Sequence, residues 1–317
     1  MSFVPAEITL PALIERAGKR TILRFVEFFT VHISNANTRQ AYGRALKAFL
    51  AWCEQRGVTE INGVQPLHVA GYREALWQDG YSVPTIKQHL AAIRELFDWL
   101  VEGHLLEVNP ASSVKGPRYS ISRGLTPVLD ADEARLLLNS IDTSSTLGLR
   151  DRALLGLLTY TFARISAAVS MKVEDYYCRG KRWRVRLHEK NGKIIDAACH
   201  HKLEAYLDEY LQATGIAEDR QGPLFRTAGG RTGLLSDRAM TRIDAWLMVR
   251  RRAAAAGISG RIGCHTFRAT GITAYLKNGG TIDRAQKLAG HASSKTTALY
   301  DRRDDEISVE EVERIVI

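Results

Sequence analysis

The sequence is divided by residues 109–127, a segment that cannot continue a regular helix or strand. It reads Asn-Pro-Ala-Ser-Ser-Val-Lys-Gly-Pro-Arg-Tyr-Ser-Ile-Ser-Arg-Gly-Leu-Thr-Pro, and its proline, glycine and serine residues favour turns and loops. The chain of 317 residues exceeds one typical domain, and each side of the segment is long enough to bury its own core. We therefore expect two folded domains joined by a linker.

The first part of the chain has the periodicity of amphipathic helices. The clearest stripe follows Ser82 and Pro84, where apolar residues recur at steps of three and four: Ile86, Leu90, Ile93, Phe97 and Leu100. Similar spacing predicts three more helices within residues 21–32, 42–53 and 68–77. We expect a four-helix unit over residues 20–108, preceded by an N-terminal arm, residues 1–19.

The second part, residues 128–306, combines helical and strand patterns. Residues 149–162 are too apolar for a surface helix, and their leucines should form the centre of this domain's core. Apolar and basic residues alternate from Trp183 to His188, and Asn191-Gly192 separates them from a second short apolar run, which predicts a β-hairpin. The expected fold class is mainly α with a small β-sheet (α+β).

Two polar runs in this part allow more than one interpretation. The pair His200-His201 resembles a metal pair, but adjacent helical positions do not face one target, so we interpret it as a helix cap or surface. The run Arg250-Arg-Arg252 on a predicted helix is either a phosphate-facing edge or a solvated charge run.

The residues from 264 to 303 carry the strongest chemical signal. His265 and Arg268 stand three apart, so on a helix they share one face and can point at a single target. Arginine offers planar donors to phosphate oxygens, histidine titrates near neutral pH, and a tyrosine hydroxyl such as that of Tyr300 can act as a nucleophile. Together these residues suggest phosphoryl transfer through a phosphotyrosine.

The order His-x-x-Arg, Gly290-His291, Tyr300 resembles the active-site pattern of the tyrosine recombinases, the phage-type, Xer-like integrases. The segment Leu-Ala-Gly-His-Ala-Ser-Ser-Lys-Thr-Thr-Ala-Leu-Tyr, residues 288–300, resembles that family's nucleophile segment almost residue for residue. Arg164-Ile-Ser, directly after the apolar run, is similar to the first arginine motif of the family. The chain departs from the pattern at Ala167, where the family usually has an acidic residue.

The resemblance implies a role for six residues. Tyr300 would attack the scissile phosphate and become joined to a 3′-phosphate. Arg164, Arg268 and His291 would hold the non-bridging oxygens, and His265 would receive the tyrosine proton. A hairpin lysine would protonate the leaving 5′-oxygen; Lys190 matches it best and Lys193 next. The resemblance implies no cofactor and no metal, because arginine and lysine supply the positive charge.

The resemblance also implies the organisation and the partners of the chain. Residues 20–108 would be a helical, SAM-like core-binding domain and residues 128–306 the catalytic domain, closing as a clamp around double-stranded DNA recombination sites. A homo-tetramer would assemble on two sites. The capping-box pattern Ser308-Val-Glu-Glu311 predicts a tail helix within residues 307–317. This helix would either fold back onto its own domain or, as the resemblance favours, dock on the neighbouring protomer. The need for accessory DNA-bending proteins is left open.

Two other functions fit the same residues. A type IB topoisomerase shares the chemistry but relaxes supercoils, and a DNA-binding protein could keep the fold without cleaving. The linker cations Lys115, Arg118 and Arg123 would form either a solvated tether or a basic strap along DNA.

Charge and cysteine usage limit the partners and the compartment. The formal net charge is +9 and the isoelectric point near 9.4, which favours a polyanionic partner. The four cysteines have no metal-ligand spacing and suggest reduced thiols. No run approaches the roughly 20 apolar residues that cross a bilayer. We expect a cytoplasmic protein, nucleoid-associated when bound to DNA, with no membrane partner.

Overall fold

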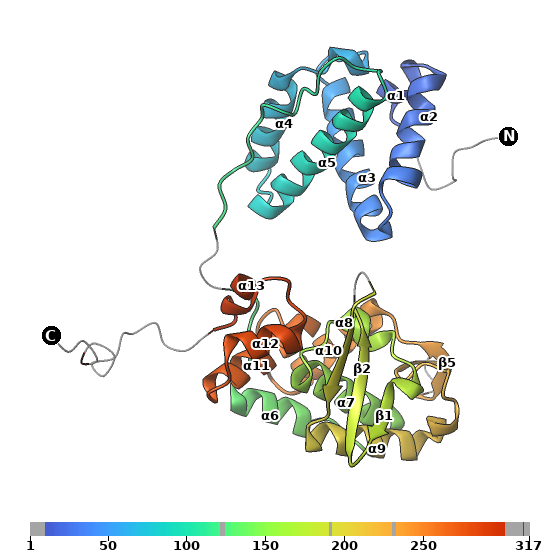
Figure 1. Cartoon of the computed structure of the whole chain (residues 1–317), viewed down its shortest axis with the longest axis vertical. Helices are drawn as coiled ribbons and strands as arrows, with labels where there is room; N and C mark the ends of the chain where they lie inside the picture. Colours follow the sequence, from blue (N-terminus) through green and yellow to red (C-terminus); the bar gives the residue numbers. More distant parts are fainter. Residues whose placement is uncertain (1–9, 121–123, 190–191, 230–232, 302–312, 314–317) are drawn as a thin grey trace. The chain divides into compact units, whose positions relative to one another are not determined.

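The computed structural model describes residues 10–120, 124–189, 192–229, 233–301 and 313. The chain forms two compact units, Met1–Ser120 (unit 1) and Ile121–Ile317 (unit 2) (Figure 1). Each unit has a hydrophobic core of its own, so each is considered separately below. No helix within the described ranges combines the length and the apolar character needed to span a bilayer.

The regular elements in the described part of unit 1 are all helical, as the periodicity predicts. Its elements are α1 (Ala12–Arg16), α2 (Lys19–Glu27) continued by the π-helical turn η1 (Phe28–His32), α3 (Ala36–Glu54), the 3₁₀ turn η2 (Ile61–Gly63), α4 (Pro66–Gln78) and α5 (Val83–Glu102). The Asn35 side chain caps α3 by accepting from the amides of Asn37 and Thr38. Proline stands in the first turn of α4 and of α5, where its missing N–H costs no helical hydrogen bond.

Unit 2 contains the remaining elements. They are α6 (Ala131–Asn139), α7 (Thr146–Tyr160), α8 (Ile165–Val169), η3 (Val173–Asp175), β1 (Tyr176–Arg179), β2 (Arg182–His188), β3 (Ile194–Ala198), α9 (His201–Thr214), η5 (Ile216–Glu218), β4 (Arg226–Ala228), β5 (Leu235–Ala239), α10 (Arg242–Ala255), α11 (Cys264–Lys277), α12 (Ile282–Ala289) and α13 (Ser294–Ala298). The fold class is mainly α with small β-sheets, which confirms the prediction.

The strands form two antiparallel sheets. One has the order β1-β2-β3, and the predicted hairpin is its β2–β3 pair, with His188 opposite Ile194. Residues 190–191 at its turn lie outside the described residues. The second sheet pairs β4 with β5.

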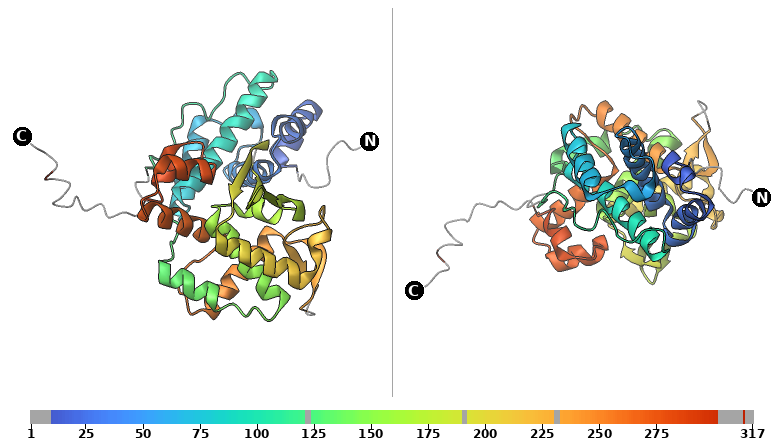
Figure 2. Two further views of the ribbon diagram at one scale, coloured as in Figure 1. Left: turned by 60° about the horizontal axis from the view of Figure 1, so that its bottom comes forward. Right: turned by 90° about the horizontal axis from the view of Figure 1, so that it is seen from above.

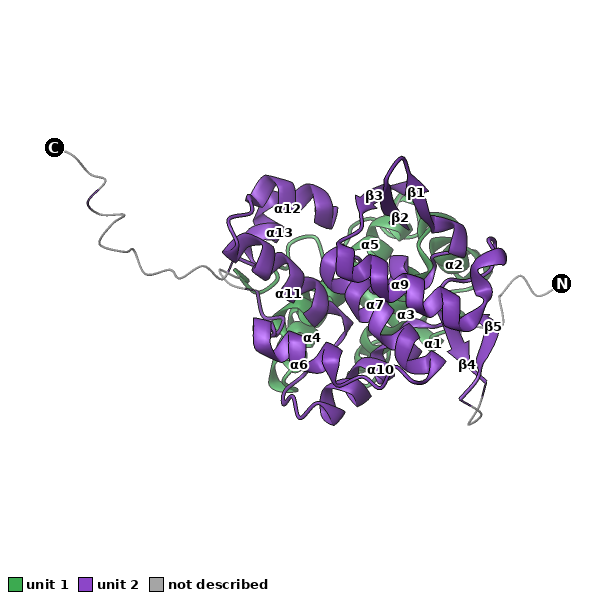
Figure 3. Cartoon of the chain, turned by 90° about the horizontal axis from the view of Figure 1, so that it is seen from below, with its two compact units in different colours: residues 1–120 green, residues 121–317 purple. Residues whose placement is uncertain are grey.

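Helix α7 is the centre of the core of unit 2, as its leucines predict. Leu154, Leu155, Leu157 and Leu158 are all fully buried. Helix α7 packs against α9 and α11 (Figure 3). The contact with α11 is close because position 271 is glycine: a Cβ there would overlap the carbonyl oxygen of Thr159.

The last helices of unit 2 form a group of their own. In both views of Figure 2 the segment from α11 to α13, in orange-red, is clustered at one place in the unit. A small apolar cluster lies within it and includes Phe162, Ala269, Ile272, Ala289 and Tyr300. This cluster fixes the end of α7, α11, α12 and the tyrosine segment relative to one another.

The arginines of the run Arg250-Arg-Arg252 on α10 do not share one environment. Arg252 pairs with the fully buried Asp151 of α7 at 2.8 Å, and Asp151 also accepts from Arg150 at 2.6 Å. The guanidinium of Arg250 lies over the Trp246 ring instead. Arg252 is therefore part of the α7–α10 interface, because a buried carboxylate requires charged partners.

Gly271→Ala should destabilise unit 2, because the added methyl forces α11 away from α7. Overpacking of this kind costs about 1–3 kcal/mol of unfolding free energy. Lys277→Ala, at an exposed position of the same helix, is the matched control and should change little. Chemical denaturation gives the free energy of unfolding of each variant, and hydrogen exchange of the α11 amides reports the local effect. Equal stability of the two variants would contradict the packing described.

Candidate active site

Helix α11 presents His265 and Arg268 on one face, as their spacing predicts. His265 Nε2 lies 2.7 Å from the Tyr300 hydroxyl oxygen. Tyr300 is buried, whereas part of His265 is open to solvent. The hydroxyl can therefore pass its proton to the ring of a residue that is partly exposed to solvent.

Arg268 is almost completely buried, with 1 % of its surface exposed. One end of its guanidinium donates to the carbonyl oxygen of Phe162, and Nη2 donates to that of Ala289 at 2.6 Å. Nη2 also lies 2.7 Å from His291 Nε2. Its Nε has no partner among the described residues. Fixed backbone acceptors thus hold this cation in place.

The Phe162 carbonyl points at Arg268 because the backbone at Phe162 has an unusual conformation. Its φ of 55° lies in the left-handed region, which non-glycine residues rarely adopt. Phe162 follows the end of α7 and precedes Arg164, the N-cap of α8. The same chain reversal therefore aims a carbonyl at one arginine and positions the other.

The hydrogen bonds of His291 assign its tautomer. Arg268 can only donate, so His291 Nε2 is the acceptor of that bond. The proton then resides on Nδ1, which lies 2.9 Å from the buried Thr297 hydroxyl. Gln286 also donates to the His291 carbonyl at 3.2 Å. The ring is neutral and fixed from both sides.

Burial and neighbouring cations determine the titration of this cluster. Burial, followed by the charges of Arg268 and Arg164, lowers the pKa of His291 to about 4. Reduced hydration and the same two arginines lower the pKa of His265, although the residue keeps an exposed part. Burial and the nearby Arg164 lower the pKa of Arg268 to about 10, which leaves it charged at neutral pH. Two neutral histidines therefore accompany charged arginines.

Tyr300 is held by its ring and by its backbone. The ring stacks on His291 with centroids 5.7 Å apart and an angle of 11° between planes. Thr273 of α11 donates to the Tyr300 carbonyl at 2.9 Å. The hydroxyl therefore has a defined direction toward His265.

Arg164 joins this group from α8. Its Nη1 donates to the Glu189 carboxylate at 2.5 Å, and the Glu189 side chain is 3 % exposed while that of Arg164 is 36 % exposed. Ala167, the departure from the family pattern, is buried and offers only a methyl group. The acidic partner of Arg164 comes from the hairpin, a contact that the sequence interpretation missed.

The two candidate lysines differ in what can be described. Lys190 lies outside the described residues. Lys193 is near the site: a Cβ built on Gly290 would lie 3.6 Å from Lys193 Nζ and 3.7 Å from Arg164 Nη1. The structure thus places five of the six predicted residues together, Arg164, His265, Arg268, His291 and Tyr300, with Lys193 beside them.

The arrangement combines a tyrosine hydroxyl, a proton acceptor and two guanidinium groups. Such a set can bind a phosphate and stabilise the charge of its transition state. In the part of the chain that the structure describes, no group of three or more His, Cys, Asp or Glu residues could hold a metal ion. The pair His200-His201 lies at the start of α9, where the His200 side chain caps the helix by accepting from the Lys202 amide.

Comparison with family models gives two matches. Residues 127–306 match the model described as "Phage integrase family". Residues 22–104 match "Phage integrase, N-terminal SAM-like domain". The first match covers more than half of the chain and includes all the site residues discussed above.

The individual proteins that are similar to this chain have low sequence identity to it. The tyrosine recombinase XerD of Listeria monocytogenes serotype 4b (strain F2365) is 28% identical over 287 residues, covering 87% of this chain and 91% of XerD. The XerH recombinase bound to difH in a post-cleavage complex has a TM-score of 0.71 at 18% identity, covering 96% and 97%. A lambda integrase tetramer bound to a Holliday junction has a TM-score of 0.67 at 18% identity, covering 96% and 82%. These structures are similar to this chain in fold.

The His291 ring should titrate near pH 4, well below the ordinary histidine value of about 6.5. Because the unfolded chain binds the proton more readily, the stability that neutral His291 contributes is full above about pH 6.5 and is lost between there and about pH 4. Ring resonances in NMR, assigned with a His291→Asn variant, measure the midpoint. A midpoint near 6.5 would contradict the buried, arginine-bonded ring.

Proposed function

Because the chain belongs to the phage integrase family, we propose that it is a site-specific recombinase that cuts and rejoins DNA strands through a covalent 3′-phosphotyrosine. The observation that carries the proposal is the hydrogen bond between the buried Tyr300 hydroxyl and His265, next to Arg268 and Arg164. A nucleophile, its base and two phosphate-binding cations are the parts that such a reaction requires.

The first step is attack of the Tyr300 oxygen on the scissile phosphorus. The hydroxyl proton moves to His265 Nε2, whose lowered pKa keeps it free to accept. A bond forms between tyrosine and the 3′-phosphate, and the bond to the 5′-oxygen breaks. The stack on His291 holds the tyrosine ring during attack.

The non-bridging oxygens would bind to Arg164, Arg268 and His291. Negative charge builds on these oxygens in the transition state, and donors that are already fixed stabilise it most. Arg268 is fixed by two backbone carbonyls. His291 would donate from Nε2 once the phosphate replaces the contact with Arg268; this requires the ring proton to move from Nδ1 to Nε2, after which Nδ1 would accept from the Thr297 hydroxyl.

The leaving 5′-oxygen needs a proton, and a hairpin lysine would supply it. We retain Lys190 as the best match to the family, with Lys193 as the alternative. Lys193 has the support of its position near Gly290 and Arg164. Reversal of the same steps, with a different 5′-hydroxyl attacking the phosphotyrosine, joins the new strand and releases Tyr300 without ATP.

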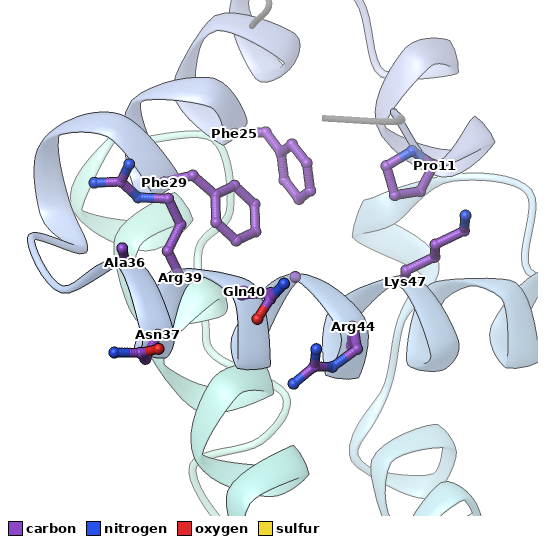
Figure 4. Close-up of a pocket in the computed structure, with 10 residues that line it drawn as sticks. Pro11, Phe25, Phe29, Ala36, Asn37, Arg39, Gln40, Arg44 and Lys47 are labelled. Carbon is purple, nitrogen blue, oxygen red and sulfur yellow. The ribbon is translucent and has the colours of Figure 1, made fainter. Parts of the chain in front are cut away.

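The partner is double-stranded DNA, and unit 1 offers a basic surface to it. On α3, Arg39, Arg44 and Lys47 line a hollow beside Phe25 and Phe29 of the neighbouring helical segment (Figure 4). Gln40, on the same helix, adds an amide that can bind a base edge or a phosphate (Figure 4). With a net charge of +9, phosphate contacts would supply much of the affinity.

The assembly would be a homo-tetramer on two recombination sites, clamped by both units. The lambda integrase tetramer bound to a Holliday junction supports this stoichiometry. The tail expected to link protomers, residues 307–317, is almost entirely outside the described residues, so its helix and its docking stay predictions. The same holds for a requirement for accessory DNA-bending proteins and for location at the nucleoid. The named relatives support neither a topoisomerase nor a silent DNA-binding protein.

Tyr300→Phe should abolish covalent attachment to DNA and leave binding within about twofold, because only the nucleophilic oxygen is removed. The assay traps a denaturant-resistant adduct on a nicked recombination site and measures affinity separately. Tyr275→Phe is the matched control, since this tyrosine lies in the same apolar cluster and has no proposed role. An adduct that persists in Tyr300→Phe would remove Tyr300 from the reaction; no adduct with the unsubstituted protein would refute the function.

The lysine assignment has a chemical test. A 5′-bridging phosphorothiolate leaves without needing a proton, so it should restore cleavage to Lys190→Ala and add little to a variant whose general acid is intact. Rescue of Lys193→Ala alone would transfer the role to Lys193. Single-turnover rates on the oxygen and sulfur substrates give the comparison.

A further inference from the structure

We propose that Glu189 is the positioning residue for Arg164, and that it fastens the β2–β3 hairpin to the phosphate-binding site. This inference rests on the proposed function. It assigns to the hairpin a task beyond carrying a lysine, and it gives Arg164 an acidic partner in a chain that has Ala167 three residues later.

The ion pair has the geometry of a brace. Arg164 Nη1 and Glu189 Oε2 are 2.5 Å apart, and the carboxylate is buried while the guanidinium keeps an exposed part. Burying a carboxylate is unfavourable unless a charged partner compensates for its lost hydration. Glu189 is therefore held in place by Arg164 as much as Arg164 is held by Glu189.

The neighbouring helix provides no substitute for this carboxylate. Arg164 is the N-cap of α8, and a side chain three residues later would lie on the same face, within reach of the guanidinium. That position is Ala167, with 1 % of its surface exposed. Among the described residues, Glu189 is the acidic group that pairs with Arg164.

The pairing leaves Arg164 able to bind phosphate. A guanidinium has five N–H donors, and the contact with Glu189 uses one of its terminal nitrogens. The Arg164 side chain keeps 36 % of its surface exposed, so the remaining donors can reach a phosphate. Glu189 Oε1 has no hydrogen-bond partner among the described residues, so Arg164 is the group that compensates for burial of this carboxylate.

The pair also fixes the hairpin. Glu189 directly follows β2, and its amide donates to the Lys193 carbonyl at 2.7 Å. Both candidate lysines, 190 and 193, lie within four residues of this anchor. The hairpin also lies close to Gly290: a Cβ added at Gly290 would lie 2.7 Å from Ile195 Cδ1 of β3. One ion pair thus sets the position of a phosphate-binding arginine and of the strand end next to the proposed acid.

The experiment compares cleavage with binding in the full chain. Glu189→Gln keeps the shape but loses the charge, and should slow single-turnover cleavage of a nicked recombination site by about tenfold to a hundredfold, the range for losing a supporting contact or displacing a reactive group. DNA affinity should stay within about twofold. Glu209→Gln removes the charge of a more exposed carboxylate that pairs with Arg152 in the same unit, and this control should cleave normally.

The decisive experiment moves the carboxylate partner of Arg164 from position 189 to position 167. Ala167→Glu introduced into Glu189→Gln places a carboxylate on the helix face next to Arg164, and should restore most of the lost rate. Glu189→Gln that cleaves as fast as the unsubstituted protein would overturn the inference. So would a slow variant that Ala167→Glu fails to rescue, because that result indicates a structural role alone. In either case the unsubstituted chain still forms its adduct, so failure of this inference is distinct from failure of the proposed function.

Discussion

The site depends on one buried cation. Arg268 lies in the interior of unit 2, where a guanidinium is stable only if its donors find acceptors. Three parts of the chain supply them: the Phe162 carbonyl, the Ala289 carbonyl and the His291 ring. Those contacts connect the end of α7, the end of α12 and α11. The same charge that the protein must satisfy in order to fold is the one that it would offer to a phosphate.

In this arrangement charged and neutral groups have different roles. The arginines stay cationic, while the lowered pKa values of His265 and His291 keep both rings neutral at neutral pH. A neutral His265 can accept a proton, whereas a charged one beside two arginines would add repulsion and have no free nitrogen. The separation follows from packing, because burial disfavours the extra charge before any substrate binds.

The sequence predicted the parts that local periodicity encodes. Helical spacing predicted α3 to α5 and the α11 face that carries His265 and Arg268, and strand alternation predicted the β2–β3 hairpin. Contacts between distant segments could not be predicted in this way. The Arg164–Glu189 pair spans 25 residues and the Arg252–Asp151 pair 101, and no spacing rule connects such positions. Ala167 did give a signal, since an arginine without its usual acid requires another partner nearby.

The Arg164–Glu189 pair has a consequence for how such a site can change over generations. A guanidinium with five donors can donate to two carboxylates at once. A chain with acids at both 167 and 189 would therefore keep Arg164 supported throughout an exchange of one for the other. The opposite order, loss of the first acid before gain of the second, passes through a form whose Arg164 has neither carboxylate. Of the two orders of change, only the one through the doubly acidic form keeps an acidic partner beside Arg164 at every step.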